Sequence, residues 1–167
     1  MTSDSRLNRL RDRIVAALGR PRPGSRRSPS RPEQDVRTPF AITYRPALDG
    51  NADPGEVVWV WVPYEEEPRR GKDRPVVIVG ELDGGRLAAV VLTSKAHPER
   101  TDHFEVGTGP WDSSRRVSYA KLDRVLSLRP DGVRREGAIL DRVRFDRLLE
   151  ALVERSGWPD IEVDVVE

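Results

Sequence analysis

The sequence contains no cysteine, and this absence removes several kinds of chemistry at once. Disulfides, thiolate metal ligands and a cysteine nucleophile are all excluded. Histidine is also scarce, with two in 167 residues, so we do not expect a metal centre built from several histidines. No apolar run approaches the roughly 20 residues of a membrane-spanning helix, and the first residues interleave apolar side chains with arginine where a signal peptide has an apolar core. We therefore expect a cytoplasmic protein without stable membrane insertion.

The net charge of +1 conceals an uneven distribution along the chain. Residues 1–38 carry ten arginines and four acidic residues, whereas the rest of the chain holds 19 basic and 24 acidic residues. A basic segment of this kind can meet anionic partners such as nucleic acid or a membrane surface. The more acidic remainder exerts no long-range attraction on RNA.

Within the basic segment, residues 1–19 are predicted to form a short basic amphipathic helix, because Leu7, Leu10 and Ile14 recur at helical spacing. Such a helix is either a solvated element of marginal stability or a docking element for a membrane or a partner. Residues 20–38 contain four prolines amid serine and arginine, and they predict a disordered linker.

Residues 39–158 read as one β-rich domain that ends in a helix. Short segments with strand character follow one another at intervals of about ten residues, which is typical of a small β-barrel. These segments are 40–44, 55–63, 74–82, 87–94, 103–107 and 115–128, and the strand pattern stops near residues 129–132. Asp141 can then cap a helix that covers one side of the barrel, with its apolar residues on one face. Residues 159–167 alternate like an edge strand but fit a frayed tail equally well.

Four pieces of this domain occur in an order that resembles the PemK/MazF family of toxins. They are PGEVVWVWVP, GKDRPVVIVG, VVLTSK and the amphipathic helix that follows EGAILDR, and they cover about residues 54–155. The resemblance implies a mainly β fold, an SH3-like small β-barrel of the CcdB/PemK/MazF type with a C-terminal α-helix. It also implies the toxin of a type II toxin–antitoxin system that forms a homodimer, binds a cognate antitoxin, and binds DNA as the toxin–antitoxin complex. Many such toxins are endoribonucleases (mRNA interferases) that cut single-stranded RNA.

Cleavage of RNA needs neither a metal nor another cofactor, because the 2′-hydroxyl supplies the nucleophile. A base must take the hydroxyl proton, and donors must stabilise the charge that develops on the phosphate. Arg74 begins a strand after a charged loop and matches the Arg-Pro of the family, so the resemblance implies a catalytic role at the phosphate. A salt bridge to Glu66 or Asp73 is the structural alternative.

The resemblance places Thr93, at the end of the strand that reads LTSK, beside this arginine. Its hydroxyl could bind the phosphate or orient the attacking group, although threonine is also an ordinary strand residue. Ser94 and Lys95 follow it and are predicted to bind substrate.

Lys121 and Asp123 lie on one face of a later strand by alternation, so they could act as an acid/base pair. The alternative is a surface ion pair between neighbouring side chains. The sequence LDRVLSL departs from the family pattern at this point, so Arg116 or Arg124 could supply the cation instead.

Other side chains could contact RNA around this centre. The predicted substrate-binding residues in the charged loop and beyond it are Arg69, Arg70, Lys72 and Trp111. Trp111 lies in the turn-rich TGPWDSS, where we expect it to be exposed and able to stack on a base.

The remaining aromatic and titratable residues have structural interpretations. Trp59 and Trp61 share a strand face with Val57 and are expected in the core, and His97 and His103 are expected to be solvated loop residues without a role. The alternative function is a non-catalytic SH3-like barrel that binds a protein partner or nucleic acid, which the imperfect pattern and the basic extension both favour.

Overall fold

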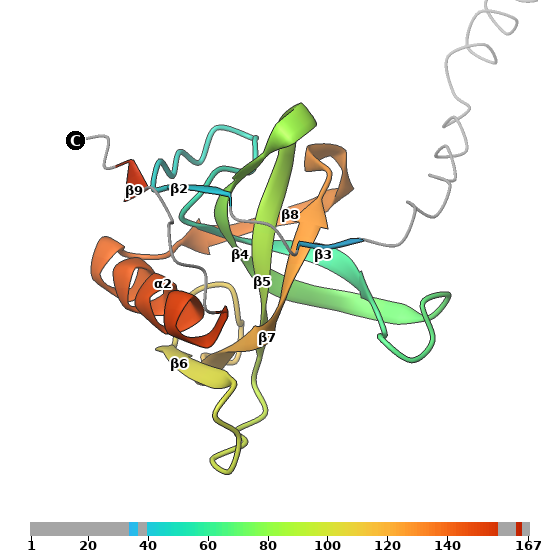
Figure 1. Ribbon diagram of the computed structural model, residues 1–167, viewed down its shortest axis with the longest axis vertical. Coiled ribbons are helices and arrows are strands. Elements are labelled where there is room, and N and C mark those ends of the chain that lie inside the picture. Colours follow the sequence, from blue (N-terminus) through green and yellow to red (C-terminus); the bar gives the residue numbers. More distant parts are fainter. Residues whose placement is uncertain (1–33, 37–39, 157–162, 165–167) are drawn as a thin grey trace, which may run out of the picture. The chain divides into compact units, whose positions relative to one another are not determined.

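The computed structural model describes residues 34–36, 40–156 and 163–164, so the helix and most of the linker expected before residue 34 lie outside it. The described chain forms a nine-stranded sheet with one long helix, α2, packed against it (Figure 1). The strands are β1 (Gln34–Asp35), β2 (Ala41–Thr43), β3 (Glu56–Pro63), β4 (Gly71–Leu82), β5 (Arg86–Thr93), β6 (His103–Gly107), β7 (Ser118–Leu128), β8 (Val133–Ile139) and β9 (Val163–Asp164). Short 3-10 turns cover Asp83–Gly85 and Pro130–Gly132, and α2 is Arg142–Ser156. No helix in this part of the chain is long and apolar enough to cross a membrane.

The longest strand, β4, organises the sheet because different parts of it pair with different neighbours. Its first part pairs with β3 as a hairpin that projects from the sheet, and its later part pairs with β5 and with β2 (Figure 1). Along the sheet, β7 pairs with β5 on one edge and with β6 and β1 on the other, while β8 extends the sheet beyond β3. All of these pairs are antiparallel.

The expected fold class, mainly β with a C-terminal helix, is confirmed, although the backbone pairing among the described strands does not close the sheet into a complete barrel. Asp141 caps α2 as predicted, because its Oδ1 accepts a hydrogen bond from the backbone N–H of Arg144 at 3.1 Å. The helix therefore begins where the sequence placed its cap.

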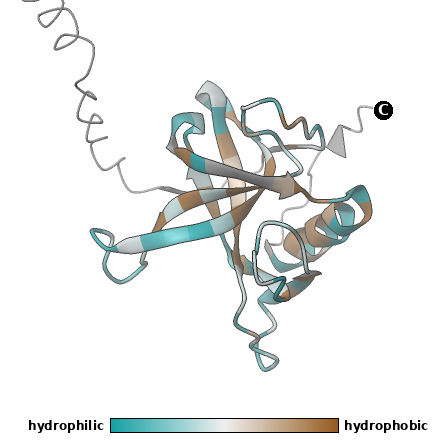
Figure 2. Cartoon of the chain, turned by 180° about the vertical axis from the view of Figure 1, so that it is seen from behind, coloured by the Kyte–Doolittle hydropathy of each residue, from teal (hydrophilic) through white to brown (hydrophobic). Residues whose placement is uncertain are grey.

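The sheet separates two apolar cores. The helix-side core contains Val57, Val77, Val90 and Leu122 together with the apolar face of α2. The second core lies on the opposite face, where alternate residues such as Val58, Val76 and Val91 gather. The central strands are apolar on both faces because each is covered twice, and Figure 2 shows this hydrophobic centre beside the hydrophilic end of the β3–β4 hairpin.

The PGEVV motif at the start of β3 has a structural explanation. Gly55 has φ 99° and its Cα lies so close to Tyr44 that an added Cβ would be 2.8 Å from the ring. The Glu56 side chain is fully buried and accepts hydrogen bonds from the backbone N–H groups of Ala47 at 3.0 Å and Asp53 at 3.4 Å. This buried carboxylate therefore fastens the loop before β3.

Two segments differ from those expected, and one open alternative gains support. Strand β8 was not predicted, because VRREGAI is too polar to show alternation, and its pairing with β3 comes from backbone hydrogen bonds. The expected linker at 20–38 is wrong at Gln34–Asp35, which pair with β7 as β1. In the tail, Val163–Asp164 pair in parallel with β2 as β9, which favours the edge strand over the frayed tail at these two residues.

Candidate functional site

A small hollow of about 120 Å³ opens where the end of β3 and its following loop meet β4, β5 and β7. Its lining residues are Val62, Pro63, Tyr64, Glu65, Arg74, Val91, Lys121, Asp123 and Arg124. Three of the four predicted catalytic residues therefore line one hollow, although they are far apart in the sequence.

Strand alternation explains why these side chains meet. On β4, Val76 and Ile78 belong to the second core, so Arg74 points to the same face two residues earlier. On β7, Leu122 belongs to the helix-side core, so Lys121 and Asp123 point to the opposite face, where the hollow lies. The predicted common face of Lys121 and Asp123 is confirmed.

Thr93, the fourth predicted catalytic residue, does not line the hollow but ends β5 on the same face. Val91 lies opposite Val76 at the last pair of the β4–β5 ladder, and Thr93, two residues further along β5, points to the same face as Val91. The Thr93 Oγ1 accepts a hydrogen bond from the backbone N–H of Lys95 at 3.2 Å, so its hydroxyl proton is available to a second partner. Ser94 and Lys95 follow Thr93 as exposed residues that do not line the hollow.

Arg74 is partly buried, and within the described chain no carboxylate lies within ion-pair distance of its guanidinium. The expected alternative of a salt bridge to Asp73 does not form, since Asp73 pairs with Arg134 at 3.2 Å. Positive charge accumulates here, because three basic side chains lie near one another. The Arg74 guanidinium is the largest cause that lowers the pKa of Lys72, and burial and Lys95 lower it further. Three cations at adjacent strand ends repel one another, and an anion would relieve that repulsion.

The other side of the hollow holds a network of opposite charges. Lys121 Nζ lies 3.6 Å from Asp123 Oδ2 and 3.7 Å from Glu65 Oε1, and Arg124 Nη1 lies 4.0 Å from the same Glu65 oxygen. The side chains of Lys121 and Asp123 are 28% and 25% exposed, although Asp123 taken with its backbone is an exposed residue, and the Glu65 side chain is 58% exposed. The network thus combines the Asp123 carboxylate on β7 with the more exposed Glu65 carboxylate on the loop after β3.

The sequence indicates Arg124 only as an alternative cation and does not place Glu65 in the site. Arg124 follows Asp123 directly and stands at the edge of the hollow with 14% of its side chain exposed. The contribution of Glu65 has no signal in the sequence, because it depends on the loop after β3 approaching β7. Tyr64 also lines the hollow and is 38% exposed.

The predicted loop cations are not gathered in the hollow. Arg69 and Arg70 are exposed on the hairpin loop, and Arg70 Nη1 pairs with Glu67 Oε2 at 3.1 Å within that loop. Lys72 differs from them, because it lies on β4 close enough to Arg74 for its pKa to be lowered.

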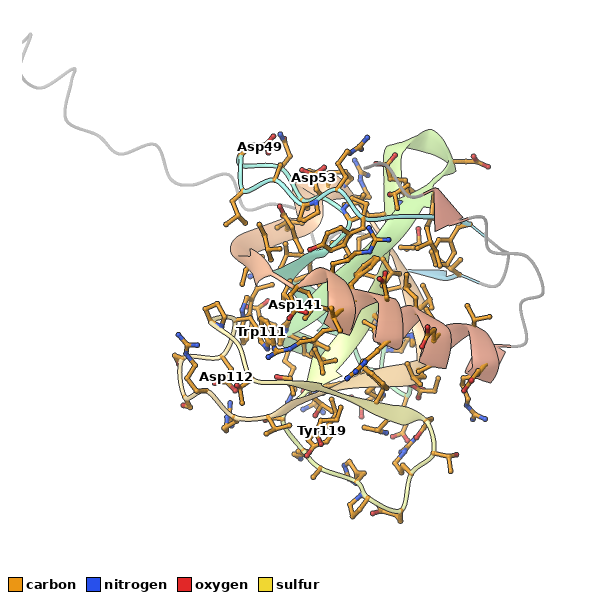
Figure 3. The ribbon with its side chains drawn as sticks, turned by 90° about the vertical axis from the view of Figure 1, so that its left-hand side faces the viewer. Asp49, Asp53, Trp111, Asp112, Tyr119 and Asp141 are labelled. Carbon is orange, nitrogen blue, oxygen red and sulfur yellow. The ribbon has the colours of Figure 1, made fainter. Side chains whose placement is uncertain are left out.

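The prediction that Trp111 is exposed is wrong. Its side chain is 2% exposed and lies in the helix-side core, on the side of the sheet that carries α2 (Figure 3). The ring lies directly on Gly109, where an added Cβ would be 2.0 Å away, and its Nε1 donates to Ser118 Oγ at 3.0 Å. Trp111 therefore holds its loop in place and offers no surface for a base.

Two further expectations change with the structure. Trp59 and Trp61 are only partly buried and belong to neither core, although Trp59 Nε1 donates to the Trp111 carbonyl oxygen at 3.2 Å. His103 is the first residue of β6 with only 5% of its side chain exposed, so the prediction of a solvated loop residue is wrong for it. His97 is 41% exposed, as expected.

Residues 53–155, more than half of the chain, match the family described as PemK-like, MazF-like toxin of type II toxin-antitoxin system. The chain belongs to this toxin family. The match spans every residue of the hollow and all of α2 except Ser156. No match was found among curated proteins.

Two solved structures are similar over most of their length. An endoribonuclease from a mycobacterial species is 19% identical, and the alignment covers 66% of this chain and 96% of that one with a TM-score of 0.46. The MazE-MazF complex from Deinococcus radiodurans is 20% identical, with 63% and 95% covered and a TM-score of 0.46.

Proposed function

We propose that this toxin is a metal-independent endoribonuclease that cuts single-stranded RNA at the hollow between β4, β5 and β7. The observation that supports it is the Arg74 guanidinium, which is partly buried, has no carboxylate partner in the described chain, and faces an acid/base pair. A planar fork of donors in this setting suits a phosphate group.

The reaction needs one bond to form and one to break. The 2′-oxygen attacks the adjacent phosphorus, the bond from phosphorus to the 5′-oxygen breaks, and the products carry a 2′,3′-cyclic phosphate and a free 5′-hydroxyl. Asp123 takes the proton from the 2′-hydroxyl, and Lys121, whose Nζ lies 3.6 Å from Asp123, gives a proton to the leaving oxygen. Arg74 and the Thr93 hydroxyl donate to the phosphate oxygens as their charge increases.

The surrounding residues bind the neighbouring nucleotides. Lys72, Lys95 and Ser94 stand at the strand ends next to Arg74 and contact flanking phosphates. Tyr64, at the rim of the hollow, offers an aromatic face on which a base can stack. Arg69 and Arg70 are exposed enough to add long-range attraction.

Membership of the family supports a protein partner as well. A cognate antitoxin would bind this chain and mask the cationic face, and two copies of the chain would form a homodimer. Sedimentation of the purified chain at micromolar concentration tests the second point, because a monomeric mass would contradict it.

A second candidate function is a non-catalytic barrel that binds a protein partner. One observation favours it: Glu65 lies beside both Lys121 and Arg124, so a carboxylate already occupies two cations of the hollow. An acidic segment of a partner could replace Glu65 without any chemistry following.

Incubation of the purified full-length chain with mixed-sequence RNA in the presence of a metal chelator separates the two candidates. The nuclease predicts fragments with 2′,3′-cyclic phosphate and 5′-hydroxyl ends. No fragments from a folded protein, or fragments only after metal is added, would overturn the proposal, and the first result would favour the binding module.

A further inference from the structure

A second cluster of titratable groups lies beside the hollow, at the start of β6. Asp102 is buried, with 10% of its side chain exposed, and its carboxylate binds two cationic or titratable partners. Arg100 Nε and Nη2 donate to Oδ1 at 2.8 Å and to Oδ2 at 2.5 Å, and His103 Nδ1 lies 3.0 Å from Oδ1. None of these three residues has a place in the reaction proposed above.

The backbone connects this cluster to the acid/base pair. His103 is the direct cross-strand partner of Lys121 in the β6–β7 ladder, so their side chains point to the same face. The carbonyl oxygen of Asp102 accepts a hydrogen bond from the backbone N–H of Leu122 at 2.7 Å, between Lys121 and Asp123. Asp123 is also near enough to contribute to the raised pKa of Arg100, after the dominant hydrogen bond to Asp102.

The charge that the cluster presents to Lys121 is set by an ion pair and by one imidazole beside it. The hydrogen bond from Arg100 is the main reason that the pKa of Asp102 lies well below its usual range. Asp102 therefore stays ionised, and the positive charge of Arg100 offsets its negative charge. With neutral His103 the three groups sum to zero, and with protonated His103 they carry one positive charge next to Lys121. Histidine is the side chain that changes charge between pH 5 and 8.

We propose that His103 is a positioning residue that adjusts the site to pH: its protonation adds a cation across the strand from Lys121 and strengthens binding of an RNA phosphate in the hollow. This inference rests on the proposed function, because it concerns regulation of RNA binding at that same site by pH. The hydrogen bond to Asp102 orients the imidazole with Nδ1 toward the carboxylate, which directs the added charge to a fixed place.

The charged groups around His103 determine the sign of the effect. Lys121 faces it from β7, Arg100 and His97 face it from the loop, and Asp102 and Glu105 belong to its own segment. The rings of His97 and His103 are 5.3 Å apart, but His97 has its own carboxylate, Glu99, at 3.2 Å. The Glu99 carboxylate therefore offsets a positive charge on His97. A positive charge on His103 is not offset in this way, because Arg100 already neutralises the charge of Asp102.

The test measures binding of an RNA that cannot be cut. A mixed-sequence 2′-O-methyl oligonucleotide lacks the nucleophile, so the dissociation constant of the full-length chain can be followed from pH 7.5 to 5.5. His103→Asn is the test variant, because its side-chain amide can still donate to Asp102, and His97→Gln is the matched control. Circular dichroism at each pH shows that each variant is folded.

The wild type and His97→Gln should gain about threefold more affinity on acidification than His103→Asn, which is the size expected for one added charge at partly screened distances of several ångströms. The difference should shrink in high salt. An equal pH dependence in wild type and His103→Asn would overturn this inference and leave the nuclease proposal standing. A folded wild type that neither binds at any pH nor cuts ordinary RNA would overturn both.

Discussion

Glu65 Oε1 lies 3.7 Å from Lys121 Nζ, so a loop carboxylate rests against the lysine at the centre of the proposed site. The same oxygen lies 4.0 Å from Arg124 Nη1. More than half of the Glu65 side chain is exposed, so this pairing is worth little to stability and is easily replaced. Glu65 is therefore placed to compete with a phosphate for both cations.

Removal of this competitor should strengthen RNA binding. In Glu65→Gln, Lys121 and Arg124 lose the Glu65 carboxylate, while Lys121 keeps Asp123 at 3.6 Å, and we expect affinity for the uncleavable oligonucleotide to rise about threefold at low salt. Glu67→Gln is the matched control, because Glu67 pairs with Arg70 inside the loop. Equal gains in the two variants would show that only net charge matters and that Glu65 does not occupy the site.

Substitutions of Thr93 test whether its hydroxyl group contributes to RNA cleavage. Thr93→Val keeps the shape but removes the donor to phosphate, so RNA cleavage should slow by about tenfold, the size of one hydrogen bond. Thr93→Ser keeps the hydroxyl and should retain most of the rate, measured under the same single-turnover conditions. If serine and valine reduce the rate equally, the methyl group and its packing matter, and the hydroxyl has no role in catalysis.

Trp111 should affect stability and leave recognition unchanged. Trp111→Phe loses the hydrogen bond to Ser118, which costs about 1–2 kcal/mol, and Trp111→Ala also leaves a cavity, for about 3–5 kcal/mol in all. Urea unfolding measures both values. RNA affinity of the folded Phe variant should equal that of the wild type, and a loss of affinity without a loss of stability would mean that Trp111 contacts RNA.

Asp102 should give the stability a dependence on acid pH. Its pKa in the folded chain is held well below the usual range by Arg100, so its contribution is present above the unfolded pKa of about 3.9 and is lost as the pH falls toward the folded pKa. Asp102→Asn should be less stable than the wild type by about 1–3 kcal/mol at pH 7, with a smaller difference below about pH 4. A difference that stays constant from pH 7 to pH 3 would contradict this assignment.

The central strands and the helix could be predicted from the sequence because their signals are local. Strands β3, β4 and β5 are covered on both faces and appear as continuous apolar runs, and Asp141 marks the start of α2. Strand β8 could not be found in this way. Its residues are mostly polar, and its place is determined by hydrogen bonds to β3, which leave no pattern in the side chains.

The site residues likewise differ in whether their signal is local in the sequence. Arg74, Lys121 and Asp123 were accessible because strand alternation and a family resemblance both act on residues near one another in the sequence. Glu65 and His103 were not accessible, because each depends on a neighbour more than 15 residues away: Lys121 lies next to both. Trp111 was misplaced because its turn-rich segment suggested exposure, whereas Gly109 and Ser118 let the ring fold onto the sheet.

The cleavage rate of RNA by Arg74→Ala, measured beside wild type in the presence of a chelator, tests the central claim most directly. Arg129→Ala is the control, since Arg129 is an exposed arginine that pairs with Asp131 and does not line the hollow. We predict a loss of about 100- to 1,000-fold for Arg74→Ala, with folding intact, and a rate close to wild type for Arg129→Ala. Cleavage by a folded Arg74→Ala at the wild-type rate would contradict the account and place the chemistry elsewhere on the chain.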